Sequence, residues 1–174
     1  MDKINEVLTR GVEKIYPTKE ALEKILRSGK KIRLYQGFDP SMPNLHLGNM
    51  VGVLKLKQFQ DLGCEVIFLV GDFTGMIGDP TDKSATRPVL THEQTRKNCE
   101  SWKQQAGKVL KFDGQNPAKF MFNSEWLGKI SFEDLIRITA NFTAQQMLER
   151  DFFQKRLKEN RPIHLNEFLY PVAQ

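Results

Sequence analysis

The stretch from Tyr35 to Asn49 constrains the fold of this 174-residue chain more than any other segment. Apolar and polar residues alternate at its start, which predicts a short buried strand at residues 31–38. Pro40 and Pro43 then exclude a helix, because a residue before proline is pushed to extended geometry and proline has no N–H to donate. Apolar residues spaced by threes and fours follow, so the sequence predicts a helix at residues 46–62.

The first turn of this predicted helix carries His46, Gly48 and Asn49. Backbone N–H groups at a helix start are unpaired and lie at the positive end of the helix dipole, which suits phosphate. His46 and Asn49 add side-chain donors there, while Gly37 and Gly48 allow a ligand to approach the backbone. A histidine that only caps the helix explains the same three residues equally well.

A nearly continuous apolar run at residues 65–70 follows the predicted helix and is typical of a central parallel strand. Strand, helix and strand in this order indicate a right-handed crossover. We therefore expect an α/β fold, a Rossmann-like parallel sheet flanked by helices, with a third strand at residues 119–122. Ligands of such sheets bind beyond the carboxyl ends of the strands, where residues 71–80 emerge.

Helices are predicted in the remainder of the chain. One apolar face runs from Ile4 to Ile15, a second helix is capped by Thr18, and a third spans Thr91 to Leu110. From Ser131 onward the helical pieces are short, and capping boxes are expected at Ser131 with Asp134 and at Thr143 with Gln146. Trp126 is expected in the core, whereas Phe142, Met147, Phe152 and Phe153 fit either a core or a subunit surface.

Composition excludes several classes of protein. No run of about 18 apolar residues occurs, and the charged N-terminus is unlike a signal peptide, so we expect a cytoplasmic protein without membrane association. Cys64 and Cys99 form no CxxC pair, so we expect reduced packing residues and no dedicated metal site. The formal net charge of +5 suits an anionic partner, although solvated helix faces account for most of this charge.

Several motifs resemble those of one family. The run Gly37-Phe38-Asp39-Pro40 with His46-Leu47-Gly48-Asn49 is similar to the HIGH-type motif of class I aminoacyl-tRNA synthetases, and Tyr35 before it is similar to the bacterial tyrosyl-tRNA synthetases. Further stretches agree in the order of the family. They are residues 71–80, 123–128, 147–151 and 167–171, and then Gln174.

The resemblance implies an enzyme that activates L-tyrosine with ATP, which Mg²⁺ accompanies, and passes the tyrosyl group to tRNA(Tyr). It implies catalytic donors at His46, Asn49, Lys83 and Arg87. It implies an ATP site formed by Gly37, Asp39, Ser41, His46, Gly48 and Asn49. It implies a tyrosine site formed by Tyr35, Asp79, Asn123, Tyr170 and Gln174.

Purely structural or surface roles are the alternatives for three of these residues. A turn-capping aspartate before proline is the alternative for Asp79, and solvated charge is the alternative for Lys83 and Arg87. The resemblance further implies a homodimer. It also implies N-terminal helices at residues 1–30 that pack on an incomplete catalytic domain at 31–174, which includes a helical connective region at about 131–165.

Two departures from the family pattern bear on activity. Asn49 stands where the family motif usually has a second histidine, and an amide can donate a hydrogen bond but cannot carry charge. No Lys-Met-Ser-Lys-Ser-like motif occurs in the 174 residues. We therefore expect the N-terminal portion of a catalytic domain, which is inactive by itself.

Two other functions are compatible with the sequence. A tryptophanyl-tRNA synthetase shares the fold, although Tyr35 and the Gly-Phe-Asp-Pro run favour tyrosine. A non-catalytic nucleotide- or RNA-binding module is the alternative if 174 residues is the natural length, and the reading frame beyond Gln174 discriminates between them.

Overall fold

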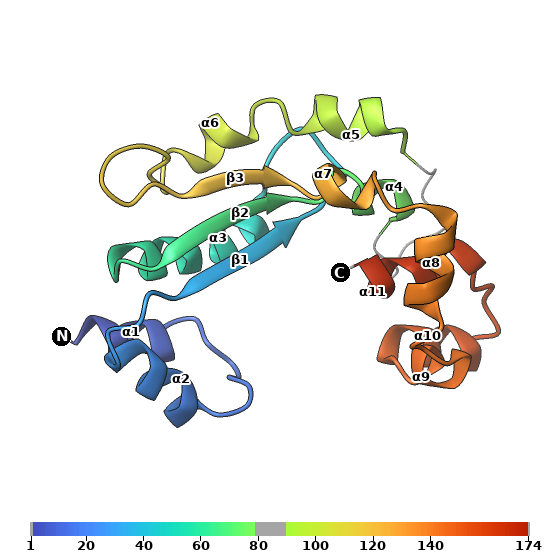
Figure 1. Ribbon diagram of the computed structural model, residues 1–174, viewed down its shortest axis with the longest axis horizontal. Coiled ribbons are helices and arrows are strands. Elements are labelled where there is room, and N and C mark those ends of the chain that lie inside the picture. Colours follow the sequence, from blue (N-terminus) through green and yellow to red (C-terminus); the bar gives the residue numbers. More distant parts are fainter. Residues whose placement is uncertain (1, 79–89, 174) are drawn as a thin grey trace. The chain divides into compact units, whose positions relative to one another are not determined.

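The computed structural model describes residues 2–78 and 90–173 (Figure 1). Asp79, Lys83, Arg87 and Gln174, all predicted as site residues, lie outside these ranges. The chain forms two compact units. The first comprises residues 1–38, 42–70 and 99–121, and the second comprises residues 39–41, 71–98 and 122–174.

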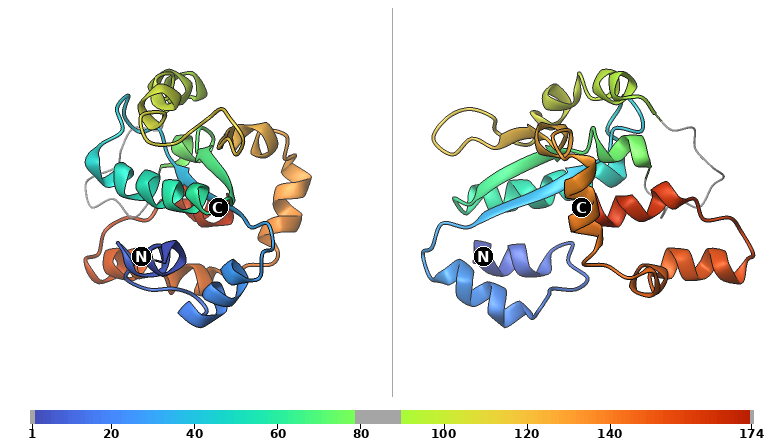
Figure 2. Two further views of the ribbon diagram at one scale, coloured as in Figure 1. Left: turned by 90° about the vertical axis from the view of Figure 1, so that its left-hand side faces the viewer. Right: turned by 45° about the vertical axis from the view of Figure 1, so that its right-hand side comes forward.

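The first unit is built on a three-stranded sheet. Its strands are β1 (Arg33–Phe38), β2 (Glu65–Val70) and β3 (Lys119–Phe122), in the order β1-β2-β3. β1 and β2 are parallel and in register from Arg33 opposite Glu65 to Phe38 opposite Val70, and the three arrows in Figure 1 point the same way. Helix α3 (Leu47–Asp61) connects β1 to β2, and the further views show it along one face of these strands (Figure 2). The predicted Rossmann-like arrangement is therefore confirmed.

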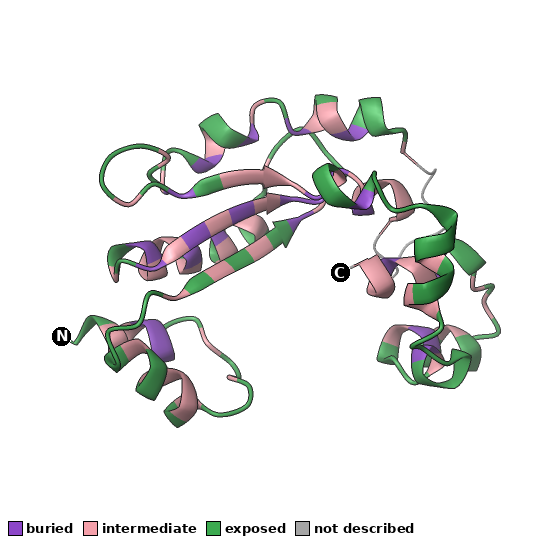
Figure 3. Ribbon diagram, viewed as in Figure 1, coloured by how far each residue is buried: buried purple, intermediate pink, exposed green. Residues whose placement is uncertain are grey.

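Aromatic rings form the core of the first unit. The ring of Phe68 on β2 is fully buried and stacks against Phe38 on β1, at 4.6 Å between centroids, and against Phe120 on β3, at 5.3 Å. Trp102, at the start of α6 (Trp102–Ala106), meets the same ring edge-on at 6.5 Å. Buried residues alternate along β2, as Figure 3 shows, because successive side chains of a strand point to opposite faces.

The face that α3 turns to the core differs from the one its sequence pattern marks. Leu47 and Val51 indicate the helix correctly, but their side chains are 87% and 62% exposed. Val53 and Leu56 are buried instead. The helix carries apolar residues on two opposite faces, so spacing predicts a helix without deciding which face meets the sheet.

The N-terminal helix is shorter than predicted. α1 (Lys3–Thr9) ends well before Ile15, because the backbone is extended at Arg10 and Gly11 then adopts a φ of +64°, which a helix cannot accommodate. α2 (Lys19–Arg27) begins as expected, with the Thr18 hydroxyl accepting a hydrogen bond from the backbone N–H of Ala21. Both helices belong to the first unit, where Lys55 Nζ of α3 donates to the carbonyl oxygens of Val7 and Arg10 at 2.9 and 2.7 Å.

The second unit is helical. Its elements are α4 (Thr74–Ile77), α5 (His92–Asn98), α7 (Ser124–Leu127), α8 (Phe132–Thr139), α9 (Ala144–Leu148), α10 (Asp151–Lys158), the 3₁₀ helix η1 (Leu165–Phe168) and α11 (Leu169–Ala173). The capping boxes predicted at Ser131 and Thr143 are both confirmed. Met147 and Phe153 are core residues, whereas Phe142 is exposed. The core position expected for Trp126 is wrong, because its ring is 43% exposed and Leu127 is the buried residue of this short helix.

The single helix predicted from Thr91 to Leu110 is also wrong. The capping box of Thr91 with Gln94 is present, but the helix stops at Asn98 and α6 begins only at Trp102. The two halves have different partners: Asn98 donates to the carbonyl of Pro40 in the second unit, whereas Trp102 packs on Phe68 in the first. Tertiary contacts thus override the local helical pattern between residues 98 and 102.

Two further predictions concern cysteines and membrane spans. Cys64 and Cys99 are buried and are not joined by a disulfide, and burial raises the pKa of the Cys64 thiol. Among the residues that the structure describes, no helix has both the length and the apolarity needed to cross a lipid bilayer.

Candidate functional site

His46 and Asn49 form a reciprocal cap at the first turn of α3. The backbone N–H of Asn49 donates to Nδ1 of His46 at 3.3 Å, and the backbone N–H of His46 donates to Oδ1 of Asn49 at 3.0 Å. A neutral imidazole that accepts at Nδ1 carries its proton on Nε2, so His46 keeps a side-chain donor while it caps the helix. The capping role and a ligand-binding role are therefore compatible.

The geometry of this turn explains why glycine occupies position 48. A Cβ at this position would lie 3.0 Å from the His46 ring, at Cε1 and Nδ1. The missing side chain therefore leaves room for the imidazole in its capping position.

Replacing Asn49 by alanine should weaken this cap. The backbone N–H of His46 would lose its acceptor, and losses of this kind cost about 1 kcal/mol of stability. Urea denaturation followed by circular dichroism would measure the change. Asn49→Asp keeps an acceptor at a helix start and should retain the stability, so equal losses in both variants would contradict the capping role.

The loop that leads to His46 is fastened by α6. Nε1 of Trp102 donates to the carbonyl of Pro43 at 3.1 Å, and Oε1 of Gln105 accepts from the backbone N–H of Leu45 at 2.9 Å. These contacts satisfy backbone groups that Pro40 and Pro43 keep out of regular structure. In the sequence, only their position on a predicted helix distinguishes Trp102 and Gln105.

Tyr35 projects from the face of the sheet that α3 leaves uncovered. Its neighbour Gln36 meets α3, where a Cβ on Gly52 would lie 2.3 Å from the Gln36 amide. Successive strand residues alternate between faces, so Tyr35 lies on the opposite face. Its side chain is 62% exposed, which leaves the phenol accessible within this unit.

A chain of hydrogen bonds links four polar residues of the second unit. The Tyr170 hydroxyl donates to Oδ2 of Asp39 at 2.6 Å, and the Thr74 hydroxyl donates to Oδ1 of Asp39 at 2.7 Å. Nδ2 of Asn123 donates to Oγ1 of Thr74 at 2.9 Å, and its Oδ1 accepts from the backbone N–H of Phe73. Asn123 and Tyr170, predicted for tyrosine, are thus connected through Asp39, which was predicted for ATP.

Glycine at position 71 allows the Asp39 and Thr74 side chains to lie close to the backbone. A Cβ at Gly71 would lie 1.9 Å from Oδ1 of Asp39 and 2.4 Å from Oγ1 of Thr74. No side chain fits there without moving the aspartate. The missing side chain at Gly71 therefore allows Asp39 and Thr74 to approach the backbone closely.

A second carboxylate, Asp72, is fully buried beside this chain. Its Oδ1 accepts from the backbone N–H of Ser124 at 3.0 Å. Its Oδ2 accepts from the Ser124 hydroxyl at 2.7 Å, pairs with Nε of Arg96 at 2.7 Å, and lies 3.0 Å from Nε2 of His92. Burial alone raises the pKa of Asp72, but the Ser124 and His92 hydrogen bonds and the charge of Arg96 together outweigh burial and hold the pKa below its usual value. The carboxylate is therefore ionised at neutral pH.

Asp72, Thr74, His92, Arg96 and Ser124 were not predicted as site residues. Asp72 and Ser124 each stand two residues after the end of a strand, β2 and β3 respectively. The rule that polar groups gather at the carboxyl ends of parallel strands is the signal that could have found them.

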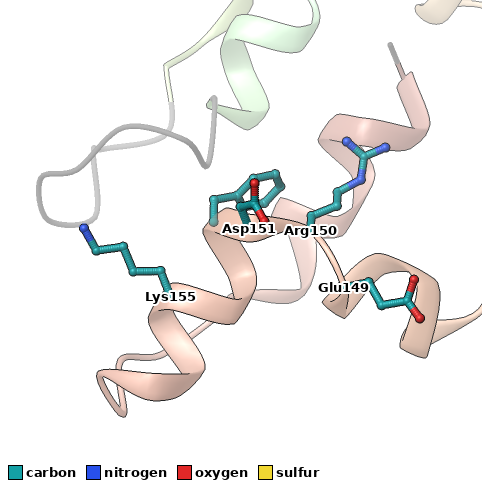
Figure 4. Close-up of a pocket in the computed structure, with 5 residues that line it drawn as sticks. Glu149, Arg150, Asp151 and Lys155 are labelled. Carbon is teal, nitrogen blue, oxygen red and sulfur yellow. The ribbon is translucent and has the colours of Figure 1, made fainter.

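A shallow pocket lies at the start of α10, away from these residues in the sequence. Glu149, Arg150, Asp151, Phe152 and Lys155 line it. Glu149 and Lys155 point to opposite sides (Figure 4), so the acidic and basic groups do not converge on one ligand. Within residues 2–78 and 90–173, no group of three or more His, Cys, Asp and Glu side chains is arranged to hold a metal ion.

The parallel sheet and its connecting helix α3 define a Rossmann-like α/β fold. Comparison with known proteins narrows this class. The family model described as tRNA synthetases class I (W and Y) matches residues 27–174, and the chain belongs to this family.

Curated relatives of the chain include tyrosine–tRNA ligases. Those of Haemophilus ducreyi and Nitrosomonas europaea are each 48% identical, over 96% and 97% of this chain. The chain spans only 41% and 40% of their respective lengths.

Solved structures show the same fold. The C-terminally truncated mitochondrial tyrosyl-tRNA synthetase of Coccidioides posadasii superposes with a TM-score of 0.77 at 25% identity, over 98% of this chain and 49% of that one. The corresponding protein of Aspergillus nidulans gives a TM-score of 0.82 at 24% identity, over 99% of this chain and 52% of that one.

Proposed function

We propose that this protein takes part in tyrosine–tRNA ligation: ATP-dependent activation of L-tyrosine, then transfer of the tyrosyl group to tRNA(Tyr). Family membership and the ligase names of the relatives support the reaction class. The observation that best supports the location of the tyrosine site is the chain of hydrogen bonds from Tyr170 through Asp39 and Thr74 to Asn123.

In the first step, a carboxylate oxygen of tyrosine attacks the α-phosphorus of ATP. A bond forms between that oxygen and phosphorus, and the bond to the bridging oxygen of pyrophosphate breaks. The products are tyrosyl-adenylate and pyrophosphate. The adenylate then passes its acyl group to a tRNA hydroxyl, which loses its proton, and AMP leaves. The nucleophile is already ionised at neutral pH, so positioning and charge stabilisation supply the catalysis.

The ATP side of the reaction is assigned to the loop that follows β1 and to the start of α3. By the family resemblance, Gly37, Ser41 and Gly48 belong to the nucleotide site, and His46 Nε2 and the Asn49 amide offer donors to phosphate oxygens. Lys83 and Arg87, which lie outside the described residues, would meet the pyrophosphate as charge develops there. Mg²⁺ enters with ATP as part of the substrate.

The tyrosine side is assigned to Tyr35, Asn123 and Tyr170, with Asp79 and Gln174 outside the described residues. The Asp39 carboxylate holds the Tyr170 hydroxyl and supplies the negative charge that suits the α-ammonium group of the substrate. The exposed phenol of Tyr35 would pair with the substrate phenol, so that phenylalanine leaves it without a partner.

Calorimetric titration of the full-length protein tests this function, with L-tyrosine as ligand and L-tryptophan and L-phenylalanine as controls. We expect selective tyrosine binding, and Tyr35→Phe should weaken it about 5-fold, because one hydrogen bond between uncharged groups contributes about 1 kcal/mol. Phenylalanine affinity should stay unchanged in that variant. Preference for tryptophan would favour the tryptophanyl alternative, and absence of pyrophosphate exchange with either amino acid would favour a binding module.

The assembly is a separate part of the proposal. Phe132, Ile136 and Phe142 are exposed apolar residues of the second unit, and a second copy of the chain would cover them in a homodimer. Residues 131–165 would then be the connective region of a catalytic domain that begins near residue 31. Such a protein works in the cytoplasm, and sedimentation would show the dimer.

A further inference from the structure

We propose that Asp72 is a positioning residue of the amino acid site, which holds Asn123, and through it Thr74 and Asp39, in the arrangement that binds the substrate. The inference rests on the proposed function for its substrate, but not for its geometry. All residues that it involves belong to the second unit.

The geometry places two adjacent residue pairs side by side. Asp72 binds both the backbone N–H and the hydroxyl of Ser124, while Phe73, the next residue, donates its backbone N–H to the side chain of Asn123, the residue before Ser124. The two bonds to Ser124 therefore fix the backbone from which Asn123 projects. Asn123 in turn orients Thr74 through its Nδ2 at 2.9 Å.

The same carboxylate also locates α5. Arg96 and His92 both reach Oδ2 of Asp72, and Oγ1 of Thr95 donates to the backbone carbonyl of Asp72 at 2.9 Å. Three segments thus meet at one residue: the loop after β2, the start of α7 and the first turns of α5. A fully buried carboxylate is retained at such a point only when its hydrogen bonds are satisfied, and here they are.

Asp72→Asn disturbs this point without changing its size. An amide oxygen can still accept the hydrogen bond from the Ser124 N–H. The NH₂ group of the amide, however, would face Ser124 Oγ, Arg96 Nε and His92 Nε2, whose hydrogen bonds Oδ2 now accepts. We expect Ser124 and Asn123 to shift, and the bond from the Phe73 N–H to Asn123 to open more often. The dissociation constant for tyrosine should rise at least 10-fold, whereas the dissociation constant for ATP should stay within 2-fold, because the residues assigned to ATP at the start of α3 belong to the other unit.

Asp134→Asn is the matched control. Oδ2 of Asp134 accepts from the backbone N–H of Ser131 at 3.0 Å and from its hydroxyl at 2.6 Å, so it repeats the bonds of Asp72 to Ser124 in an exposed helix cap. The same chemical change there should leave both dissociation constants unchanged. Ser124→Ala keeps Asp72 and removes only the hydroxyl, so it should raise the dissociation constant for tyrosine about 3-fold. This variant replaces Asp72→Asn in the test if Asp72→Asn does not fold.

Two measurements on the full-length protein decide the matter: hydrogen exchange of the Phe73 amide by NMR, and calorimetry with tyrosine and with ATP. Faster exchange at Phe73 together with selective loss of tyrosine binding supports the positioning role. Unchanged exchange and unchanged tyrosine binding in both Asp72→Asn and Ser124→Ala overturn it, as does equal loss of tyrosine and ATP binding. If the unaltered protein binds no tyrosine, the proposed function fails, and the Phe73 exchange alone still decides whether Asp72 holds Asn123.

Discussion

Phe68→Ala should lower the free energy of unfolding by about 3–5 kcal/mol, the usual cost of removing a large aromatic side chain from a packed core. The ring is fully buried and meets Phe38, Phe120 and Trp102, so its removal leaves a cavity bounded by three aromatic side chains. These neighbours come from β1, β3 and α6, which limits how far the site can collapse. Because proteins of this size are stable by only about 5–15 kcal/mol, the variant should melt far below the parent chain.

Phe132→Ala is the control for this prediction. The Phe132 side chain is 78% exposed at the start of α8, so its removal should change the unfolding free energy by less than about 0.5 kcal/mol in the monomer. Urea denaturation at low protein concentration, followed by far-UV circular dichroism, measures both variants. Equal losses would mean that the aromatic stack does not form the core of the first unit.

Local signals predicted most of the fold because they depend on neighbours in sequence. The strands at Phe38 and Val70 follow from alternation and from apolar runs, and the boxes at Ser131 and Thr143 follow from spacings of three residues. The HIGH-like run was likewise placed correctly at the start of α3, since prolines before it and periodicity after it leave few alternatives.

Tertiary contacts decided the rest. Nothing local distinguishes Leu47 from Val53 as the inward residue of α3, because both faces of that helix are apolar and only the sheet selects between them. The break between α5 and α6 has the same origin. Asp72 was not predicted as a site residue, because its hydrogen-bond partner Ser124 lies 52 residues away and such a pair leaves no periodic pattern. Its position just after a buried strand is the only local signal.

The hydrogen bonds of Asp39 favour a role other than the one that the family resemblance implies. The family resemblance assigns this residue to ATP, yet its two carboxylate oxygens accept hydrogen bonds from Thr74 and Tyr170. Tyr170 is assigned to tyrosine by the same resemblance. We therefore propose that Asp39 belongs to the amino acid site, where its charge would act on the substrate ammonium group.

Asp39→Asn should weaken tyrosine binding by about 10- to 100-fold. Hydrogen bonds to a charged partner contribute about 1.5–3 kcal/mol each, and the amide both loses the charge and presents an NH₂ group to one of the two hydroxyl donors. Tyr170→Phe removes one of those donors and keeps the charge of Asp39, so its loss of tyrosine affinity should be smaller. The measurement is calorimetry of the full-length variants with tyrosine and with ATP separately.

Asp61→Asn provides the control, because Asp61 pairs with Lys57 on the surface of α3 and the same chemical change there should leave both ligands bound as before. A fall in ATP affinity alone in Asp39→Asn would restore the assignment to the nucleotide. A fall in tyrosine affinity alone would instead establish that the residue serves the amino acid. The two titrations thus separate a role of Asp39 in ATP binding from a role in tyrosine binding. The motif alone does not separate them, because Gly37, Asp39 and His46 occur in one short run of sequence. Thr74 and Tyr170, in contrast, contact Asp39 only in the folded chain.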